Sequence, residues 1–263
     1  MRSIKSFPKD LFVQRHRRSM RFSRTSLPAI FAAALLFAMH PVPLTHAQQN
    51  SGGTTTQRPY IMLDPAHGGA DTGAHITDSI AEKEITLELT ARLRPLLASR
   101  FNVITTRDAD VANGLSTDQR AEIMGRHHAV ACIVVHATGS GNGVHLYTSA
   151  LPPSSGARHG LLPWDTAQSW YVQQSTRLMA ELNTALTRAS FGVTTGQTAL
   201  RPLDNLACPA VAIEIAPFTP AKGGDTLAVT DGSYQQRVAE AVATAMLFWR
   251  GHDESDTDQR RTP

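Results

Sequence analysis

Short apolar segments with the composition of β-strands alternate with longer amphipathic segments along most of this chain. The predicted strands are residues 60–64, 102–107, 131–137, 143–149 and 210–216. The predicted helices are residues 82–97, 116–127, 170–188 and 234–249. Strands that alternate with helices favour a three-layer α/β sandwich, in which helices flank a largely parallel central sheet. The alternation therefore predicts one α/β domain, which we place at residues 58–250.

The N-terminal segment has a different composition. A basic region ends at Arg24, an apolar stretch runs over residues 27–39, and a small-x-small sequence ends at Ala47. This order is typical of a secretory signal peptide, so we predict that residues 1–47 are a signal cleaved after Ala47, from a periplasmic or secreted protein. An uncleaved interfacial anchor is the alternative. No apolar run reaches the roughly 18 residues that span a bilayer, so we expect no stable membrane insertion after cleavage.

Two further segments flank the predicted domain. Residues 48–57 are polar and rich in Gly and Thr, which predicts a linker, and residues 251–263 are charged, which predicts a disordered tail. The formal net charge of +3 does not describe the domain, because residues 1–47 hold much of the basic content. The rest of the chain is acidic on balance. It lacks the basic character of a nucleic-acid-binding domain, and we expect no nucleic-acid partner.

The chain contains two cysteines, Cys132 and Cys208. A disulfide bond is permitted in an exported protein. If the two cysteines lie on level, parallel, neighbouring strands, their positions are offset by two residues, or about 7 Å along the strand. That offset is awkward for a disulfide. The spacing therefore favours two buried free thiols.

Three polar residues interrupt the apolar pattern where strands end. His67 lies in the loop after the first strand, His136 ends the segment 131–137, and Glu214 stands inside the segment 210–216. In α/β sheets, functional residues gather at the carboxyl ends of strands. A carboxylate inside an apolar strand is costly if unpaired, so we predict a specific partner for Glu214. A single histidine at a strand end is commonly structural, but two with a glutamate favour a site.

The helix at residues 82–97 adds a fourth candidate. Successive helical residues turn by about 100°, which places Glu82 about 20° from Leu89, on the apolar stripe that faces the core. Glu84 and Glu88 are about 140° and 100° away from Leu89, so we expect both to be solvated. Two histidines and one glutamate with an open fourth position form a catalytic zinc arrangement.

We therefore predict one Zn²⁺ per chain, with His67, Glu82 and His136 as ligands. Glu214 would then be the general base, and later the proton donor to the leaving amine. Of the other histidines, His145 is the one that we expect nearest to the metal.

The segment from residue 60 to residue 249 also resembles the zinc-dependent N-acetylmuramoyl-L-alanine amidases of the cell-separation type. The similar segments follow the family's order. They are Asp64-Pro65-Ala66-His67-Gly68-Gly69, Asp71-Thr72-Gly73-Ala74, Glu82-Lys83, Thr106-Arg107-Asp108, Leu115-Ser116 with Arg120, Val135-His136-Ala137, and Cys208-Pro209-Ala210-Val211 through Glu214-Ile215. The resemblance implies that His67, Glu82 and His136 bind zinc and that Glu214 is catalytic. It also implies a peptidoglycan substrate, cut between the lactyl group of muramic acid and L-alanine.

Some positions depart from the family pattern. Ala66 stands where the family has Gly, Thr138 replaces an Asn, and Ala216-Pro217 replaces a Gly-Phe pair. None of these changes removes a predicted ligand or the predicted base. Two alternatives remain: a catalytically idle peptidoglycan-binding or regulatory domain on the same fold, and a zinc carboxypeptidase or other amidohydrolase. The sequence identifies no activator protein.

Overall fold

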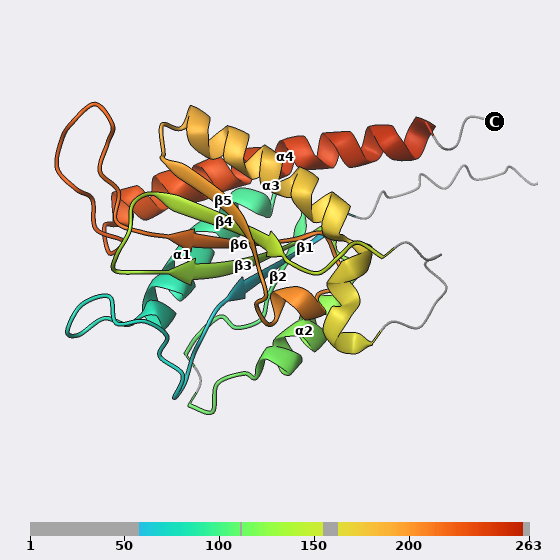
Figure 1. Ribbon diagram of the computed structural model, residues 1–263, viewed down its shortest axis with the longest axis horizontal. Helices are drawn as coiled ribbons and strands as arrows, with labels where there is room; N and C mark the ends of the chain where they lie inside the picture. Colours follow the sequence, from blue (N-terminus) through green and yellow to red (C-terminus); the bar gives the residue numbers. More distant parts are fainter. Residues whose placement is uncertain (1–57, 111, 155–162, 260–263) are drawn as a thin grey trace, which may run out of the picture. The chain divides into compact units, whose positions relative to one another are not determined.

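The structure of this chain is a computed structural model that describes residues 58–110, 112–154 and 163–259 (Figure 1). The predicted signal peptide at residues 1–47 and the predicted linker at residues 48–57 lie outside the described residues. No helix within the described residues is long and apolar enough to span a bilayer.

The described strands form a 6-stranded sheet with the order β2-β1-β3-β6-β4-β5. The strands are β1 (Tyr60–Pro65), β2 (Asn102–Thr105), β3 (Ala131–Ala137), β4 (Val144–Ser149), β5 (Val193–Thr198) and β6 (Ala210–Ile215). Neighbouring strands are parallel except for β4 and β6, which are antiparallel. The predicted largely parallel sheet is therefore confirmed, with one antiparallel step next to β6.

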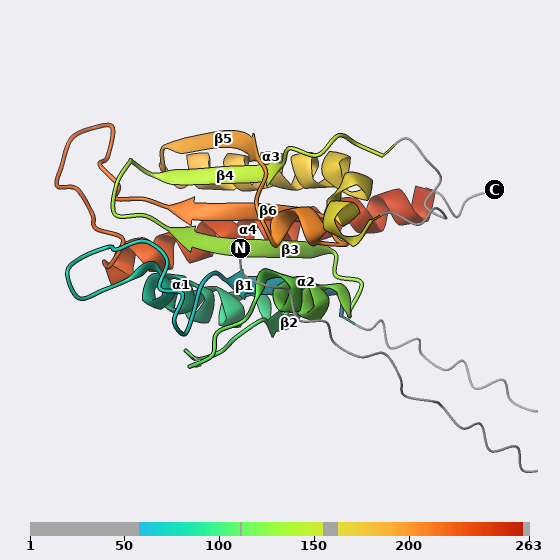
Figure 2. The ribbon, with the colours of Figure 1, turned by 60° about the horizontal axis from the view of Figure 1, so that its bottom comes forward.

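Helices cover both faces of the sheet. They are α1 (Glu82–Leu97), α2 (Thr117–Gly125), α3 (Val172–Arg188) and α4 (Gly232–Gln259), with short 3₁₀ turns η1 (Trp164–Trp170) and η2 (Leu203–Asn205). One apolar core lies between the sheet and α1, α3 and α4, and a second lies between the sheet and α2 with η2. In Figure 2, α3 and α4 pass behind the strands and α2 lies in front. The three predicted layers are confirmed.

The central position of β3 explains why its sequence is apolar. Ile133 and Val135 point into the core under α1, α3 and α4, whereas Cys132 and Val134 point into the core under α2. A strand covered on both faces needs apolar side chains in both directions, because successive side chains alternate between the faces. His136 follows on the α2 side, at the carboxyl end of the strand.

Strand β5 was not predicted from the sequence. Its residues, Val-Thr-Thr-Gly-Gln-Thr, are mostly polar and partly or fully exposed. It is an edge strand that pairs only with β4 among the described strands. An edge strand is held by backbone hydrogen bonds to one neighbour and need not show the apolar alternation on which prediction depends.

Helix α4 includes residues 251–259 of the segment predicted to be a disordered tail, and residues 260–263 lie outside the described residues. Helix α4 continues to Gln259, past the predicted end at residue 249. Proline is absent from residues 250–259, so the helix that begins in the packed core can propagate through this charged segment.

A disulfide bond joins Cys132 of β3 to Cys208, which lies just before β6. Their Cα atoms are 6.1 Å apart, within the usual range for a disulfide. The prediction of two free thiols is wrong because it placed Cys208 on the straight line of the strand. Cys208 instead lies in a bend, and the N–H of Cys132 donates to the carbonyl of Pro209 at 2.8 Å. The disulfide therefore ties together the strands that carry His136 and Glu214.

Candidate metal centre

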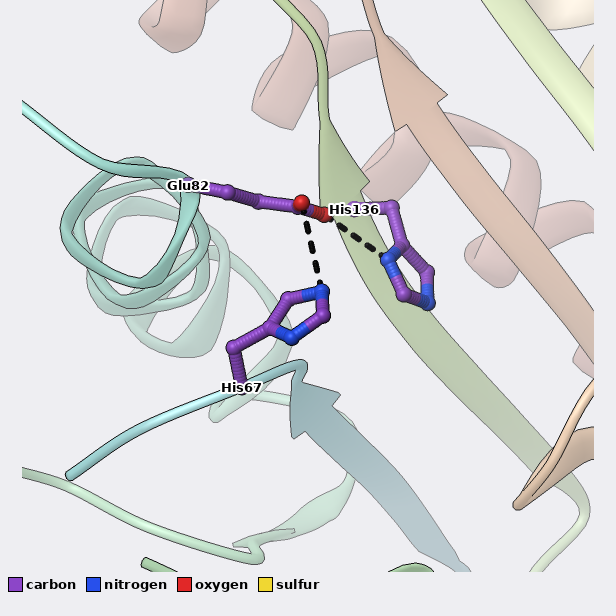
Figure 3. A group of neighbouring side chains, drawn as sticks. All are labelled: His67, Glu82 and His136. Atoms are coloured by element: carbon purple, nitrogen blue, oxygen red, sulfur yellow. Dashed lines mark hydrogen bonds and ion pairs between the residues drawn. The ribbon is translucent and has the colours of Figure 1, made fainter. Parts of the chain in front are cut away.

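Three predicted ligands meet at the carboxyl end of the sheet. His67 comes from the loop after β1, Glu82 is the first residue of α1, and His136 is near the end of β3 (Figure 3). One potential ligand atom from each side chain lies within 4.8 Å of the others. Glu82 Oε1 is 2.8 Å from His136 Nδ1, and Glu82 Oε2 is 3.2 Å from His67 Nε2. The structure therefore brings together the whole predicted ligand set.

Glu82 is directed inward by the start of α1. Its side chain is buried, whereas Glu84 is exposed and accepts a hydrogen bond from the N–H of Ala81 at the helix N-terminus. The N–H groups of Ala74 and Ala137 donate to the two Glu82 carboxylate oxygens, at 2.9 and 3.1 Å. The prediction that Glu82, and not Glu84, faces the core is confirmed.

The same contacts keep Glu82 ionised. Burial alone would raise the pKa of the Glu82 carboxyl. Hydrogen bonds from His136, His67 and the N–H of Ala74 outweigh burial and hold this pKa well below its usual range. An anionic carboxylate between two imidazoles is a suitable oxygen donor for a divalent cation.

His67 is oriented by a carboxylate from its own loop. Its Nδ1 lies 2.9 Å from Asp71 Oδ1 and 3.0 Å from Oδ2, while its Nε2 faces Glu82. The hydrogen bond to Glu82 raises the pKa of His67; burial opposes this effect and the hydrogen bond to Asp71 adds to it. A carboxylate on one ring nitrogen is the usual way to hold a metal-binding histidine by the other. Sequence reasoning gave Asp71 no role beyond its place in the family motif.

His136 presents one ring nitrogen to the cluster. Its Nδ1 lies 2.8 Å from Glu82 Oε1, whereas its Nε2 is buried and has no hydrogen-bond partner among the described residues. Nδ1 is therefore the atom that would bind a cation held among the three side chains. The donor set of two imidazoles and one carboxylate also matches the preference of zinc. The residues present therefore fit a zinc ion.

Gly73 packs closely against this cluster. Its φ is +67°, and a Cβ atom there would lie 2.6 Å from Glu82 Oε2 and 2.6 Å from the Cδ2 atom of His67. The backbone of Ala74 meanwhile accepts a hydrogen bond from the N–H of Glu82, at 2.8 Å. Only glycine leaves the space that the two ligand side chains occupy.

Two buried arginines hold the loop that presents His67. Arg120 donates to Asp64 Oδ1 at 2.7 Å, to the carbonyl of Pro65 at 2.8 Å, and to the carbonyl of His67. Asp64 is fully buried at the end of β1. The resemblance pointed to Arg120 as a motif position. The structure shows that Arg120 holds the His67 loop in place through hydrogen bonds to its backbone carbonyls.

Arg107 joins the same loop to α1. Its guanidinium donates to the carbonyl of Ala66 and to the carbonyl of Lys83, each at 2.9 Å, and to Thr86 Oγ1 at 3.0 Å. Burial lowers the pKa of Arg107, and the neighbouring charge of Arg120 lowers it further. The loop that carries His67 and the helix that begins at Glu82 are thus held in one position relative to each other.

Glu214 lies beside the cluster and not within it. In the pairing of β3 with β6, Glu214 is the direct partner of His136, so the two side chains leave the same face of the sheet. Glu214 Oε2 is 2.9 Å from His145 Nδ1, across the antiparallel pairing of β6 with β4. The specific partner predicted for Glu214 is therefore His145. His145, the one of the other histidines that we expect nearest to the metal, thus contacts the residue next to the cluster and is not part of the cluster itself.

The fold and the site together define a class of protein. It is an α/β domain that holds a two-histidine, one-glutamate ligand set, as in catalytic zinc sites, with a separate carboxylate on the next strand. The family model for N-acetylmuramoyl-L-alanine amidases (Amidase_3) matches residues 61–247, which include all four predicted site residues. The chain belongs to this family.

Individual relatives match shorter stretches. The chain is 33% identical over 117 residues to the N-acetylmuramoyl-L-alanine amidase AmiC of Neisseria meningitidis, a match that covers 42% of this chain and 28% of AmiC. It is 33% identical over 89 residues to the endolysin of Bacillus phage SPP1, covering 33% of this chain and 32% of the endolysin. The matches thus span no more than about a third of the length of these curated relatives.

Solved structures match most of the described domain. Ami1 of Mycobacterium smegmatis gives a TM-score of 0.58 at 18% identity, covering 74% of this chain and 98% of that structure. AmiC2 of Nostoc punctiforme gives 0.55 at 19% identity, with coverage of 74% and 98%. Both are N-acetylmuramoyl-L-alanine amidases, and at these identities the likeness shows a shared α/β fold.

Proposed function

We propose that this protein is an exported, zinc-dependent N-acetylmuramoyl-L-alanine amidase with one zinc ion per chain. Its substrate would be peptidoglycan, cut at the amide bond between the lactyl group of muramic acid and L-alanine. The observation that carries the proposal is the convergence of His67, Glu82 and His136 within 4.8 Å, beside Glu214 on the next strand. Membership of the amidase family supports the choice of substrate.

Three of the site residues would bind the metal, and a fourth would transfer a proton. His67, Glu82 and His136 would hold the ion, which when bound polarises a carbonyl and activates water. Glu214 would accept a proton from the attacking water and pass it to the nitrogen of the leaving L-alanine. Asp71 would keep the ring of His67 in its ligating orientation through the contact at Nδ1.

Export is supported by two independent features. Residues 1–47 have the order of regions of a secretory signal. The disulfide between Cys132 and Cys208 is typical of proteins that fold in an oxidising compartment. We therefore propose a periplasmic or secreted location, where peptidoglycan is accessible.

Digestion of purified sacculi tests this function. The proposed amidase releases peptides that begin with free L-alanine and leaves glycan strands whose lactyl groups carry free carboxyls, both identified by mass spectrometry. A carboxypeptidase instead removes residues from the far end of the stem. A zinc-loaded protein that binds sacculi and yields no new termini would support the idle-domain alternative and overturn the amidase proposal.

A further inference from the structure

A row of three polar side chains crosses the sheet at the candidate site. Glu214 of β6 is paired with His136 of β3 on one side and with His145 of β4 on the other. Directly paired residues project from the same face of a sheet. His136 belongs to the ligand cluster, so His145 lies on the far side of Glu214 from the cluster.

The contact between His145 and Glu214 is a directed hydrogen bond. His145 Nδ1 lies 2.9 Å from Glu214 Oε2. An ionised carboxylate can only accept, so the imidazole donates its Nδ1–H. Glu214 Oε1 accepts no hydrogen bond from any described residue, and the side chain is 29% exposed. One carboxylate oxygen is therefore held, and the other is left available.

Two further residues lie close to the imidazole ring. Tyr147, on the same face of β4, meets it edge to face with ring centroids 6.5 Å apart. Gly141, whose φ is +91°, is the second: a Cβ atom there would lie 3.3 Å from the Cε1 atom of His145. The loop at residues 139–143 thus lies close to the ring that donates to Glu214.

We propose that His145 is a positioning residue for Glu214. Its Nδ1–H fixes Oε2 and so orients the carboxylate, which leaves Oε1 as the oxygen that exchanges a proton with the reacting groups. The proposal rests on the proposed role of Glu214 as general base. A general base transfers a proton faster when its carboxylate is held in a fixed orientation at hydrogen-bond distance from the donor. Partners that orient a functional side chain commonly contribute about 10- to 100-fold to activity.

Kinetics on a soluble muropeptide with the zinc-loaded full chain test the proposal. His145→Ala should lower kcat by about 10- to 100-fold, with KM and the zinc content close to those of the unchanged protein. His145→Asn should recover most of this loss, because the asparagine amide places a donor near the position of Nδ1. His127→Ala is the matched control. His127 stacks on Tyr60 at the opposite end of the sheet, with ring centroids 4.9 Å apart, so its loss should leave kcat unchanged.

A double variant tests whether His145 acts through Glu214. His145→Ala introduced into Glu214→Gln should cause no further loss of kcat, because residues that act as a unit are not additive. The proposal is overturned by a further loss in the double variant, by an effect on KM alone, by loss of zinc in His145→Ala, or by unchanged kcat. If Glu214→Gln alone retains full activity, the proposed function fails, and that result is distinct from a failure of the His145 proposal.

Discussion

Asp64 and Arg120 form a buried ion pair, with 2.7 Å between Oδ1 and Nη1, beneath the loop that carries His67. The side chains are 0% and 4% exposed, so neither charge has water as an alternative partner. Arg120 also donates to the carbonyls of Pro65 and His67, which links the pair to the position of a candidate ligand.

Arg120→Met should therefore be strongly destabilising. Removing one partner of a buried pair leaves an uncompensated charge and typically costs about 3–5 kcal/mol. Urea unfolding of the variant and the unchanged protein measures the difference. Arg126→Met is the control, because Arg126 pairs with Glu122 at 2.7 Å with both side chains more than 60% exposed. Exposed pairs contribute about 0–1 kcal/mol, so equal losses in the two variants would contradict a structural role for the buried pair.

A comparison of Glu82→Gln with Glu84→Gln should show which glutamate binds zinc and which only caps the helix. Glu82 contacts both histidines, whereas Glu84 is exposed and accepts only the N–H of Ala81 among the hydrogen bonds of the described residues. Glu82→Gln should severely weaken zinc binding, and Glu84→Gln should keep about one zinc per chain. Metal analysis after dialysis measures both. Retention of zinc by Glu82→Gln together with its loss from Glu84→Gln would reverse the assignment.

Gly73→Ala should disturb the ligand cluster from the loop side. The added Cβ would lie 2.6 Å from Glu82 Oε2, so the carboxylate or the loop must move. Gly223→Ala is a matched control, because Gly223 also has a positive φ, +87°, but a Cβ there meets nothing within 4 Å. Both variants carry the backbone cost of a left-handed residue, about 1–2 kcal/mol. Only Gly73→Ala should also weaken zinc binding, as measured by chelator competition. Equal zinc affinity in the two variants would show that the loop can move without affecting Glu82.

The cluster of candidate ligands was predictable because it depends on local patterns. The helical period placed Glu82 on the core-facing stripe, and the ends of the apolar strands placed His67 and His136 at one edge of a parallel sheet. The structure brings these three side chains together. In each case, the signal lies within a few residues of the side chain concerned.

The surroundings of Glu214 were less predictable because they depend on strand order. The prediction of a mainly parallel sheet could not reveal that β4 runs antiparallel to β6, which sets His145 opposite Glu214. The disulfide of Cys132 and Cys208 depends in the same way on a bend before β6. A single sequence contains no direct measure of such long-range pairings.

Glu214→Gln tests the division between ligand and base. Glu214 lies beside the cluster and makes its hydrogen bond to His145, so the amide should leave the three ligands and the fold in place. We expect the zinc content and the unfolding midpoint to stay close to those of the unchanged protein. Turnover on peptidoglycan should fall by about 10²–10⁴-fold, because a glutamine amide cannot accept the proton that a general base removes.

The comparison with Glu82→Gln makes this result specific, since both changes replace a carboxylate with an amide of the same shape. Loss of a ligand should remove zinc and activity together, whereas loss of the base should remove activity alone. If Glu214→Gln loses zinc in proportion to its activity, Glu214 is a ligand, and the proton must be taken by another group. If the variant keeps both zinc and full turnover, the proposed mechanism does not operate at this site.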